Sequence, residues 1–269
     1  MKRKKFFGQH FLTDTSVVAA IVAAADLDDK TNVLEIGPGE GVLTKELVKV
    51  AKRVVALEVD REAVEATREK VGADNLEVIE QDALEISNIE IAEMFDGEPY
   101  VLVGNIPYNI TSDLLSKFLT QDNGPIRSVW MVQKEVADRM LASAGDMNRL
   151  GLMVQIFASG HRVAKVSRGA FSPPPEVDSA VVRLDHEASE NFHERGIDDP
   201  GAILRFARVA FTSKRKQLAT TLSSLPDISS EQVMVELEKI GESKTARPEE
   251  LSVGNWVKLF RGLNNRACK

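Results

Sequence analysis

Cysteine is almost absent from this chain of 269 residues, and the single one is Cys268. One cysteine cannot form an intrachain disulfide, and it cannot build a cysteine zinc site by itself. The histidines do not show the spacing of zinc ligands either; they are His10, His161, His186 and His193. We therefore expect a protein without a disulfide framework and without a bound metal.

Long apolar runs are missing as well. The longest extends from Val17 to Ala25, whereas a membrane-spanning helix needs about 20 apolar residues. The apolar part of the first stretch, MKRKKFFGQHFL, is too short for the core of a signal peptide. The sequence therefore predicts a cytoplasmic protein with no membrane partner, and we expect it to act as a monomer.

Basic residues are outnumbered by acidic ones, and the net charge is −7. This balance argues mildly against a nucleic-acid partner. The tail from Gly196 onward is different, because it holds more Lys and Arg than Asp and Glu. A basic tail on an acidic body can indicate a module that binds a polyanion.

Short β-rich segments alternate with helical patterns through the first two-thirds of the chain. This alternation is typical of a parallel, doubly wound α/β sheet. The polar stretch His186–Gly201 indicates a linker, and no β pattern follows it. Pro200, Ser230 and Pro248 are typical helix starts, so the tail is predicted to be a small all-helical domain. The expected strands are Val33–Ile36, Val54–Val59, Leu76–Glu80, Tyr100–Gly104, Ser128–Val132 and Ala180–Leu184, with another near Arg162–Val166; the clearest expected helices are Arg61–Val71 and Asp113–Leu119.

A glycine-rich turn follows the first expected strand, in the stretch VLEIGPGEGVLT (Val33–Thr44). Gly37, Gly39 and Gly41 form the pattern G-x-G-x-G, and glycine lets the backbone approach a ligand closely. A dinucleotide-binding turn would read G-x-G-x-x-G and would open a helix toward a pyrophosphate. This turn is tighter and is preceded by Glu35, so it favours a cationic ligand without phosphates.

Two acidic residues stand at the ends of the next two strands. Glu58 comes about 20 residues after the glycine turn, the distance at which a carboxylate accepts hydrogen bonds from both ribose hydroxyls. Asp82 follows the third strand, where it can accept a hydrogen bond from an exocyclic amine such as adenine N6. The same residue type also caps helices, and the two roles are compatible. The pair predicts a nucleoside pocket.

The fourth strand ends in Asn105-Ile106-Pro107-Tyr108. Proline cannot continue a central strand, because it has no N–H to give to the ladder. The Asn105 side-chain oxygen and the Ile106 carbonyl can each accept one N–H of an amino group, which exposes the nitrogen lone pair. The Tyr108 ring offers a flat face for a base. An isolated match would indicate a plain β-turn, but after the three preceding motifs we interpret it as the place where an amine reacts.

In this order the glycine turn, Glu58, Asp82 and NIPY resemble S-adenosylmethionine-dependent adenine-N6 methyltransferases. Further stretches are similar to motifs of the rRNA adenine dimethyltransferase family, and two of them to the helical tail of its KsgA branch. The resemblance covers nearly the whole chain. It implies a Rossmann-like methyltransferase sheet in residues 1–188 and a helical rRNA-binding domain in residues 189–269. The stretches are FGQHFLTD (Phe7–Asp14), NRLGLMVQ (Asn148–Gln155), FSPPPEVDSAVVRL (Phe171–Leu184), AFTSKRKQLATTL (Ala210–Leu222) and RPEELSVGNWVKL (Arg247–Leu259).

The resemblance also implies a reaction. Two adjacent adenosines in a hairpin near the 3′ end of small-subunit (16S) rRNA would each receive two methyl groups on N6, in free rRNA or in the immature small ribosomal subunit. The implied catalytic residues are Asn105, Ile106, Pro107, Tyr108 and Phe171. The residues implied to hold S-adenosylmethionine are His10, Leu12, Glu35, Gly37, Gly39, Gly41, Glu58, Val59, Asp82, Ala83 and Asn105. Those implied to bind RNA are Lys214, Arg215, Lys216 and Arg247.

Three other interpretations compete with this one. Large-subunit rRNA adenine methyltransferases of the macrolide-resistance type share the core motifs, and only the tail and the N-terminal stretch argue against them. Some relatives on this fold have become non-catalytic RNA-binding assembly factors or transcription factors, but the intact Asn105, Tyr108 and glycine turn favour retained catalysis. An NAD-linked oxidoreductase is disfavoured by the glycine spacing and by NIPY.

Overall fold

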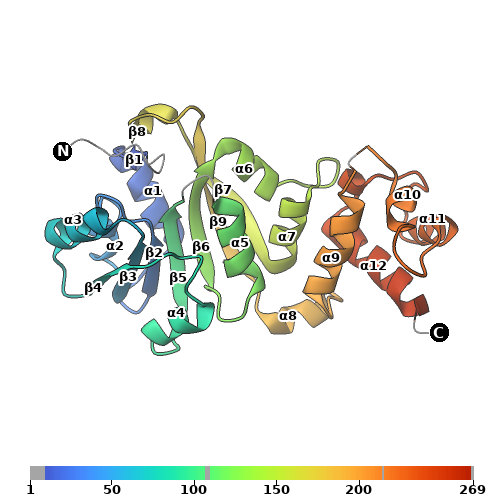
Figure 1. Cartoon of the computed structure of the whole chain (residues 1–269), viewed down its shortest axis with the longest axis horizontal. Coiled ribbons are helices and arrows are strands. Elements are labelled where there is room, and N and C mark those ends of the chain that lie inside the picture. The colour runs from blue at the N-terminus through green and yellow to red at the C-terminus, as the bar shows by residue number, and fades with distance from the viewer. Residues whose placement is uncertain (1–9, 107–109, 214, 268–269) are drawn as a thin grey trace. The chain divides into compact units, whose positions relative to one another are not determined.

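Two compact units make up the chain in the computed structural model, which describes residues 10–106, 110–213 and 215–267 (Figure 1). The first unit joins Met1–Ala137 with Ser159–His186, and the second joins Asp138–Ala158 with Glu187–Lys269. Asp138–Ala158 therefore packs with the tail, although it precedes the last strand in sequence. The functional division at residue 188 stays a prediction.

A seven-stranded sheet forms the centre of the first unit, in the order β4-β3-β2-β5-β6-β9-β7. The first five of these strands are parallel to their neighbours, and β9 lies antiparallel to β6. A separate two-stranded antiparallel sheet pairs β1 with β8. The strands are β1 (Phe11–Leu12), β2 (Asn32–Ile36), β3 (Arg53–Glu58), β4 (Leu76–Glu80), β5 (Tyr100–Asn105), β6 (Arg127–Gln133), β7 (Ala158–Val166), β8 (Phe171–Ser172) and β9 (Ser179–His186).

This architecture confirms the predicted doubly wound α/β class, and each predicted strand is present within a few residues of its expected bounds. The alternation of buried apolar runs with helices carries the prediction, because strands covered on both faces consist of nearly continuous apolar residues. The antiparallel β9 and the small β1–β8 sheet were not anticipated. Both depend on pairing between segments far apart in the chain, which no local pattern reveals.

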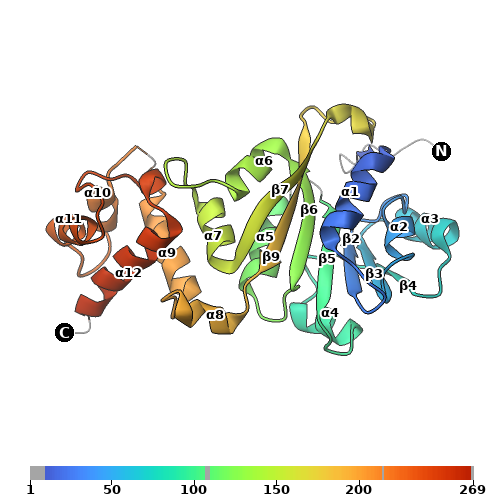
Figure 2. The ribbon, with the colours of Figure 1, turned by 180° about the vertical axis from the view of Figure 1, so that it is seen from behind.

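Helices cover both faces of the sheet in the first unit. Figures 1 and 2 show α1 on one face and α5 on the opposite one. Asp14 caps α1 by accepting a hydrogen bond from the Ser16 N–H, and Asp60 caps α3 in the same way from the Glu62 N–H. The helices are α1 (Thr15–Ala25), α2 (Thr44–Leu47), α3 (Arg61–Val71), α4 (Asn88–Met94) and α5 (Thr111–Thr120), with the 3-10 turn η2 (Arg168–Ala170); α6 (Lys134–Met140) crosses into the second unit.

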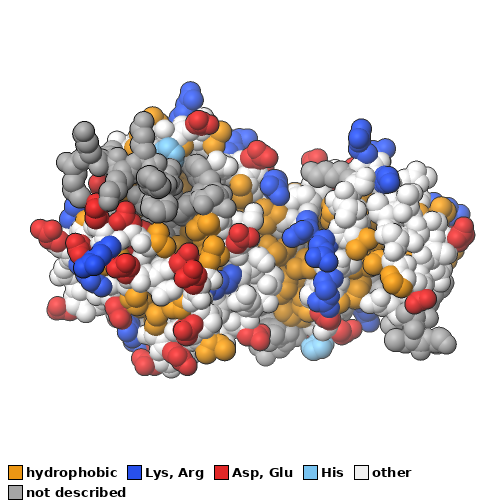
Figure 3. Space-filling model, in the orientation of Figure 1, with side chains coloured by type: hydrophobic (Ala, Val, Ile, Leu, Met, Phe, Trp, Pro, Cys, Tyr) orange, Lys and Arg blue, Asp and Glu red, His pale blue; other side chains and the backbone are white. Residues whose placement is uncertain are grey.

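The second unit is helical, as predicted for the tail. Asp199 caps α9 with Pro200 at the first helical position, and Ser229 forms a capping box with Gln232 before α11. Lys and Arg side chains are visible along the part of this unit that carries α9 (Figure 3). Its helices are α7 (Arg149–Phe157), α8 (Ser189–Glu194), α9 (Pro200–Ala210), α10 (Leu218–Leu222), α11 (Ser230–Lys239) and α12 (Val253–Ala267), with the 3-10 turn η3 (Pro248–Glu250).

Two predictions about the second unit are wrong. The expected linker His186–Gly201 contains helix α8, in which the Phe192 ring packs edge-on against Phe157 with centroids 5.5 Å apart. This tertiary contact outweighs the polar composition of the segment. Pro248 opens only the short turn η3, and α12 begins later, at Val253.

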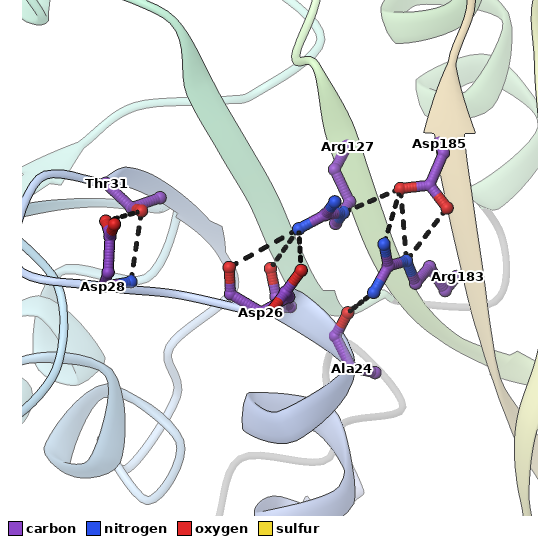
Figure 4. A network of polar contacts seen from close by, with 8 residues as sticks. Ala24, Asp26, Asp28, Thr31, Arg127, Arg183 and Asp185 are labelled. Carbon is purple, nitrogen blue, oxygen red and sulfur yellow. Dashed lines mark hydrogen bonds and ion pairs between the residues drawn. The ribbon is translucent and has the colours of Figure 1, made fainter.

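Two arginines join the end of α1 to the sheet (Figure 4). Arg127 on β6 donates hydrogen bonds to the Ala25 carbonyl and to the Asp185 carboxylate, at 3.1 and 2.7 Å. Arg183 on β9 donates to the Ala24 carbonyl and to the same carboxylate. The last carbonyls of a helix lack intrahelical partners, so these guanidinium groups complete the end of α1.

No helix in the described ranges is both long and apolar enough to cross a membrane.

His186 takes part in a short polar chain within the sheet. The Trp130 Nε1–H donates to the Ser128 hydroxyl at 2.6 Å, and that hydroxyl lies 2.7 Å from His186 Nε2. Because Ser128 accepts from Trp130, its own proton is free to point at Nε2, which suits a neutral imidazole. Burial lowers the pKa of His186 to about 4, with the Asp185 charge acting in the opposite direction.

We expect His186 to make folding stability depend on pH. Its pKa is about 6.5 in an unfolded chain and about 4 in the folded one, so the unfolded state binds the proton first as the pH falls. Its contribution is complete above about pH 6.5 and is lost toward pH 4, amounting to about 3 kcal/mol. Urea denaturation at pH 7.5 and 4.5 should therefore show a smaller loss for His186→Gln than for the parent chain. The exposed His161→Gln is the control, and an unchanged pH dependence in His186→Gln would contradict the assignment.

Candidate functional site

The candidate site lies where the strand order of the sheet reverses. β2 has β3 on one side and β5 on the other, and all three run parallel. In open α/β sheets, ligands bind at the carboxyl ends of the strands beside such a switch point. Ile36 pairs with Gly104, so the glycine turn after β2 begins beside Asn105 at the end of β5.

The glycine turn has a backbone that only glycine adopts easily. Gly37, Gly39 and Gly41 have φ values of 70°, 56° and 75°, a region that disfavours residues with a Cβ. A Cβ on Gly39 would also lie 3.3 Å from the Phe11 ring. Thr67 on α3 supports the turn, because its hydroxyl donates to the Gly39 carbonyl at 2.9 Å.

Glu58 sits at the end of β3 and holds the turn from the other side. One carboxylate oxygen accepts from the Gly39 N–H at 3.3 Å, and the other accepts from the Val59 and Asp60 N–H groups. Burial raises the pKa of Glu58, and these backbone hydrogen bonds partly oppose that shift. Each carboxylate oxygen can accept more than one hydrogen bond, so Glu58 can bind ribose hydroxyls while it keeps the turn in place.

Glu35 is the most deeply buried acid of the site, with 1% of its surface exposed. Its Oε2 atom has no hydrogen-bond partner among the described residues. Burial raises the pKa of Glu35 to about 8, and the nearby charge of Glu58 adds to the shift. A buried acid held in this way strongly favours a neighbouring cation.

The ends of β3 and β4 offer surfaces suited to an adenine ring. Val59 is 50% exposed although it is apolar, and it follows Glu58 directly. The Asp82 carboxylate accepts from the Leu84 N–H at 2.8 Å, which forms a tight turn and no regular helix. Ala83 lies buried in that turn. The Gln81 N–H donates to the Glu58 carbonyl at 2.9 Å, so the two strand ends are joined.

Asn105 is oriented by the segment that precedes β1. Its side-chain Nδ2 donates to the His10 carbonyl at 3.2 Å, while the His10 ring Nδ1 lies 2.8 Å from the Pro173 carbonyl. With the amide nitrogen directed at the protein, the Oδ1 oxygen is the atom that can accept from a substrate. Ile106 is buried, and its N–H donates to the Met131 carbonyl. Pro107 and Tyr108 lie outside the described residues.

The β1–β8 pair brings the N-terminal motif against the segment that contains Phe171. Leu12 pairs with Phe171, and both side chains are buried in the core. Leu12 can therefore contact a cofactor only through its backbone. Phe171 is 4% exposed, which limits how much of its ring a base can cover in this conformation.

One backbone hydrogen bond joins the two segments of the second unit that carry the predicted RNA-binding residues. The Leu218 N–H donates to the Ala246 carbonyl at 2.9 Å, which places the segment after Lys216 beside Arg247. Arg215, Lys216 and Arg247 are all exposed. Within the described ranges, no carboxylate side chain forms an ion pair with any of the three. Lys214 lies outside the described residues.

Sequence reasoning missed two side chains that support the site. Thr67 holds the glycine turn, and Lys117 on α5 holds the turn that contains Asp82. A signal for Lys117 was present, because it falls one helical turn after Leu114 on the apolar face of α5. Thr67 had no comparable signal, since threonines on helices are usually solvated or part of a core.

The chemistry of these residues fits S-adenosylmethionine, the cofactor implied by the resemblance. Before the glycines, which allow close approach, lies the buried Glu35, one of whose oxygens has no hydrogen-bond partner in the described part of the chain. Glu58, Val59 and Asp82 follow at neighbouring strand ends. No group of three or more metal-ligating side chains occurs in the described part of the chain.

Comparisons with known proteins identify the family of the chain. The family model described as "Ribosomal RNA adenine dimethylase" matches residues 1–265. A "Ribosomal RNA small subunit methyltransferase A" from Dehalococcoides mccartyi is 40% identical over all of this chain and 91% of the relative.

Two solved structures are similar over nearly the full length. The 23S rRNA methyltransferase ErmE is 30% identical with a TM-score of 0.75, covering 94% of this chain and 99% of that one. A dimethyladenosine transferase from Plasmodium falciparum is 27% identical with a TM-score of 0.76, covering 96% of this chain and 98% of that one. With the family model matching almost end to end, the chain belongs to the ribosomal RNA adenine dimethylase family.

Proposed function

We propose that this chain transfers methyl groups from S-adenosylmethionine to N6 of two adjacent adenosines in a hairpin near the 3′ end of small-subunit rRNA. Membership of the family makes it an rRNA adenine dimethyltransferase that uses S-adenosylmethionine. The choice of the small-subunit RNA rests on the 40% identical relative, whose name specifies that subunit.

One observation carries the catalytic part of the proposal. The Asn105 amide is directed by the His10 carbonyl at the end of β5, next to the glycine turn that follows β2. A Cβ on Gly37 would lie only 3.7 Å from the Asn105 carbonyl oxygen. A methyl donor in the turn and an amine at Asn105 would therefore be neighbours.

When bound, S-adenosylmethionine supplies a methyl group on a positively charged sulfur. The residues of the chain then have to orient the amine and exclude water. Asn105 Oδ1 and the Ile106 carbonyl would accept the two N–H groups of the adenine amine and leave its lone pair free. The nitrogen that has taken a methyl group loses one proton to water, so only one N–H remains before the second transfer, and the pocket has to accept a methyl group in place of one hydrogen. The target bases must leave their stack, which costs a few kcal/mol.

The large-subunit alternative has a specific observation in its favour, the similarity to ErmE. Incubating the protein with S-adenosylmethionine and either immature small subunits or large-subunit RNA, followed by nucleoside analysis, distinguishes the two. We expect N6,N6-dimethyladenosine in the small-subunit RNA at two adjacent positions. Methylation of the large-subunit RNA alone would overturn the choice of substrate, and methylation of neither would favour a non-catalytic factor.

The proposed partner is the small-subunit rRNA within an immature small ribosomal subunit. A protein with this substrate is expected to act in the cytoplasm, as a monomer and without a membrane partner. The exposed Arg215, Lys216 and Arg247 are proposed to contact RNA phosphates, which is the sequence-independent part of RNA binding.

Replacing Glu58 should weaken cofactor binding. Glu58→Ala removes the carboxylate proposed to bind the ribose and releases the Gly39 N–H. Hydrogen bonds to a charged group contribute about 1.5–3 kcal/mol each, so the Kd for S-adenosylmethionine should rise more than about tenfold. Calorimetry measures this, with the exposed Glu69→Ala as control. An unchanged Kd would remove Glu58 from the site.

Replacing Asn105 should reduce catalysis far more than binding. Asn105→Ala is expected to slow methyl transfer by about 10²–10³, by analogy with the loss of one oriented hydrogen-bond partner at a reacting centre. Single-turnover methylation at saturating S-adenosylmethionine measures the effect, and the Kd for the cofactor should change little. Transfer at the parent rate would show that the amide does not act on the substrate.

Neutralising the exposed basic residues of the second unit should weaken RNA binding. In the triple variant Arg215→Ala, Lys216→Ala, Arg247→Ala, the slope of log K against log salt should become shallower by about 0.7–0.9 for each lost phosphate contact. Affinity for S-adenosylmethionine should stay at the parent value. If the salt slope is also unchanged, these residues are ordinary solvated charges.

A further inference from the structure

Lys117 is a buried lysine with an unusual set of partners. It lies on α5, and only 7% of it is exposed. Its ammonium donates to the Ala83 carbonyl at 2.6 Å and to the Ile86 carbonyl. It also lies 5.4 Å from the centre of the Phe118 ring. A buried charge is destabilising unless it is well paired, and this ammonium is paired with two backbone carbonyls.

Both carbonyls belong to the turn between β4 and α4, residues Asp82–Ile86. The Asp82 carboxylate accepts from the Leu84 N–H, and the Asp82 carbonyl accepts from the Glu85 and Ile86 N–H groups. These bonds satisfy N–H groups inside the turn. Lys117 supplies donors to the carbonyls of Ala83 and Ile86, so the ammonium closes the turn from the side of α5.

Lys117 lies close to Asp82, the residue proposed to contact the adenine ring. Burial lowers the pKa of Lys117, while the charges of Asp82 and Glu90 raise it. The carbonyl of Lys117 lies 3.5 Å from the Asn88 side-chain nitrogen at the start of α4. α5 begins at Thr111, shortly after the NIPY segment in sequence. The same helix therefore follows NIPY along the chain and supports the turn that contains Asp82.

We propose that Lys117 is a positioning residue for the cofactor: its ammonium holds the Asp82–Ile86 turn in the conformation in which Asp82 and Ala83 bind the adenine ring. The inference rests on the proposed function, in which S-adenosylmethionine binds as the family resemblance implies, with Asp82 at the adenine ring. It gives a reason why a lysine occupies this buried position, where methionine would fill a similar volume without the cost of burying a charge.

A double-mutant cycle tests the proposal. Lys117→Met keeps most of the side-chain volume and removes the donors, and its Kd for S-adenosylhomocysteine by calorimetry should rise about tenfold. Asp82→Ala should also weaken binding, and the double variant should lose less affinity than the sum of the two single effects, because both changes act on the same turn. In the cofactor-free protein, the Leu84 and Ile86 amides should exchange hydrogen faster in Lys117→Met. The exposed Lys70→Met is the matched control and should change neither readout.

Each result of this experiment either supports or overturns the positioning role of Lys117. A parent-like Kd in Lys117→Met, or full additivity in the double variant, overturns the positioning role while leaving the proposed function intact. A parent-like Kd in Asp82→Ala overturns the adenine role of Asp82, and this inference with it. If Lys117→Met does not fold, Lys117→Gln replaces it in the experiment. The glutamine side chain keeps an NH2 group with two donor hydrogens. A smaller loss of affinity with the same non-additivity then supports the proposal.

Discussion

The two buried carboxylates at the glycine turn are the constraint on which the rest of the site depends. Burying acids together is unfavourable unless hydrogen bonds or a cation compensate. Glu58 is compensated by three backbone N–H groups, one of them from the turn itself. Glu35 has one oxygen without a partner in the described part of the protein, and its pKa is raised to about 8. The turn is therefore ready for a positively charged ligand, as S-adenosylmethionine is.

The remaining parts of the site are held to this turn by hydrogen bonds between neighbouring strand ends. Gln81 joins the end of β4 to Glu58, and Lys117 braces the turn that follows. On the other side of β2, the His10 carbonyl orients Asn105. The reversal of strand order makes this possible, because it places the ends of β2 and β5 next to each other. In the proposed function, one backbone frame would position both the cofactor and the amine, which suits a reaction that needs orientation more than a strong base.

Much of this arrangement could be predicted from the sequence because it is local. Glu58 and Asn105 end β3 and β5, the glycine turn and Asp82 follow β2 and β4, and parallel strands bring such residues to one edge of a sheet. Contacts between distant segments could not be predicted. The pairing of Leu12 with Phe171 buries both side chains, and the hydrogen bond between Leu218 and Ala246 brings two basic segments together. Neither contact leaves a periodic pattern.

The central claim is that the buried acid Glu35 and the cationic cofactor bind at the same turn, so that each favours the charge of the other. Calorimetry of S-adenosylmethionine binding near pH 7, in buffers with different ionisation enthalpies, measures this linkage directly. With a pKa of about 8, Glu35 is mostly protonated before binding, and a nearby positive sulfur should release up to about one proton. Release should be smaller for S-adenosylhomocysteine, whose sulfur is uncharged, and should fall to the background of the ligand in Glu35→Gln. Equal proton release for both ligands, unchanged in Glu35→Gln, would contradict the account.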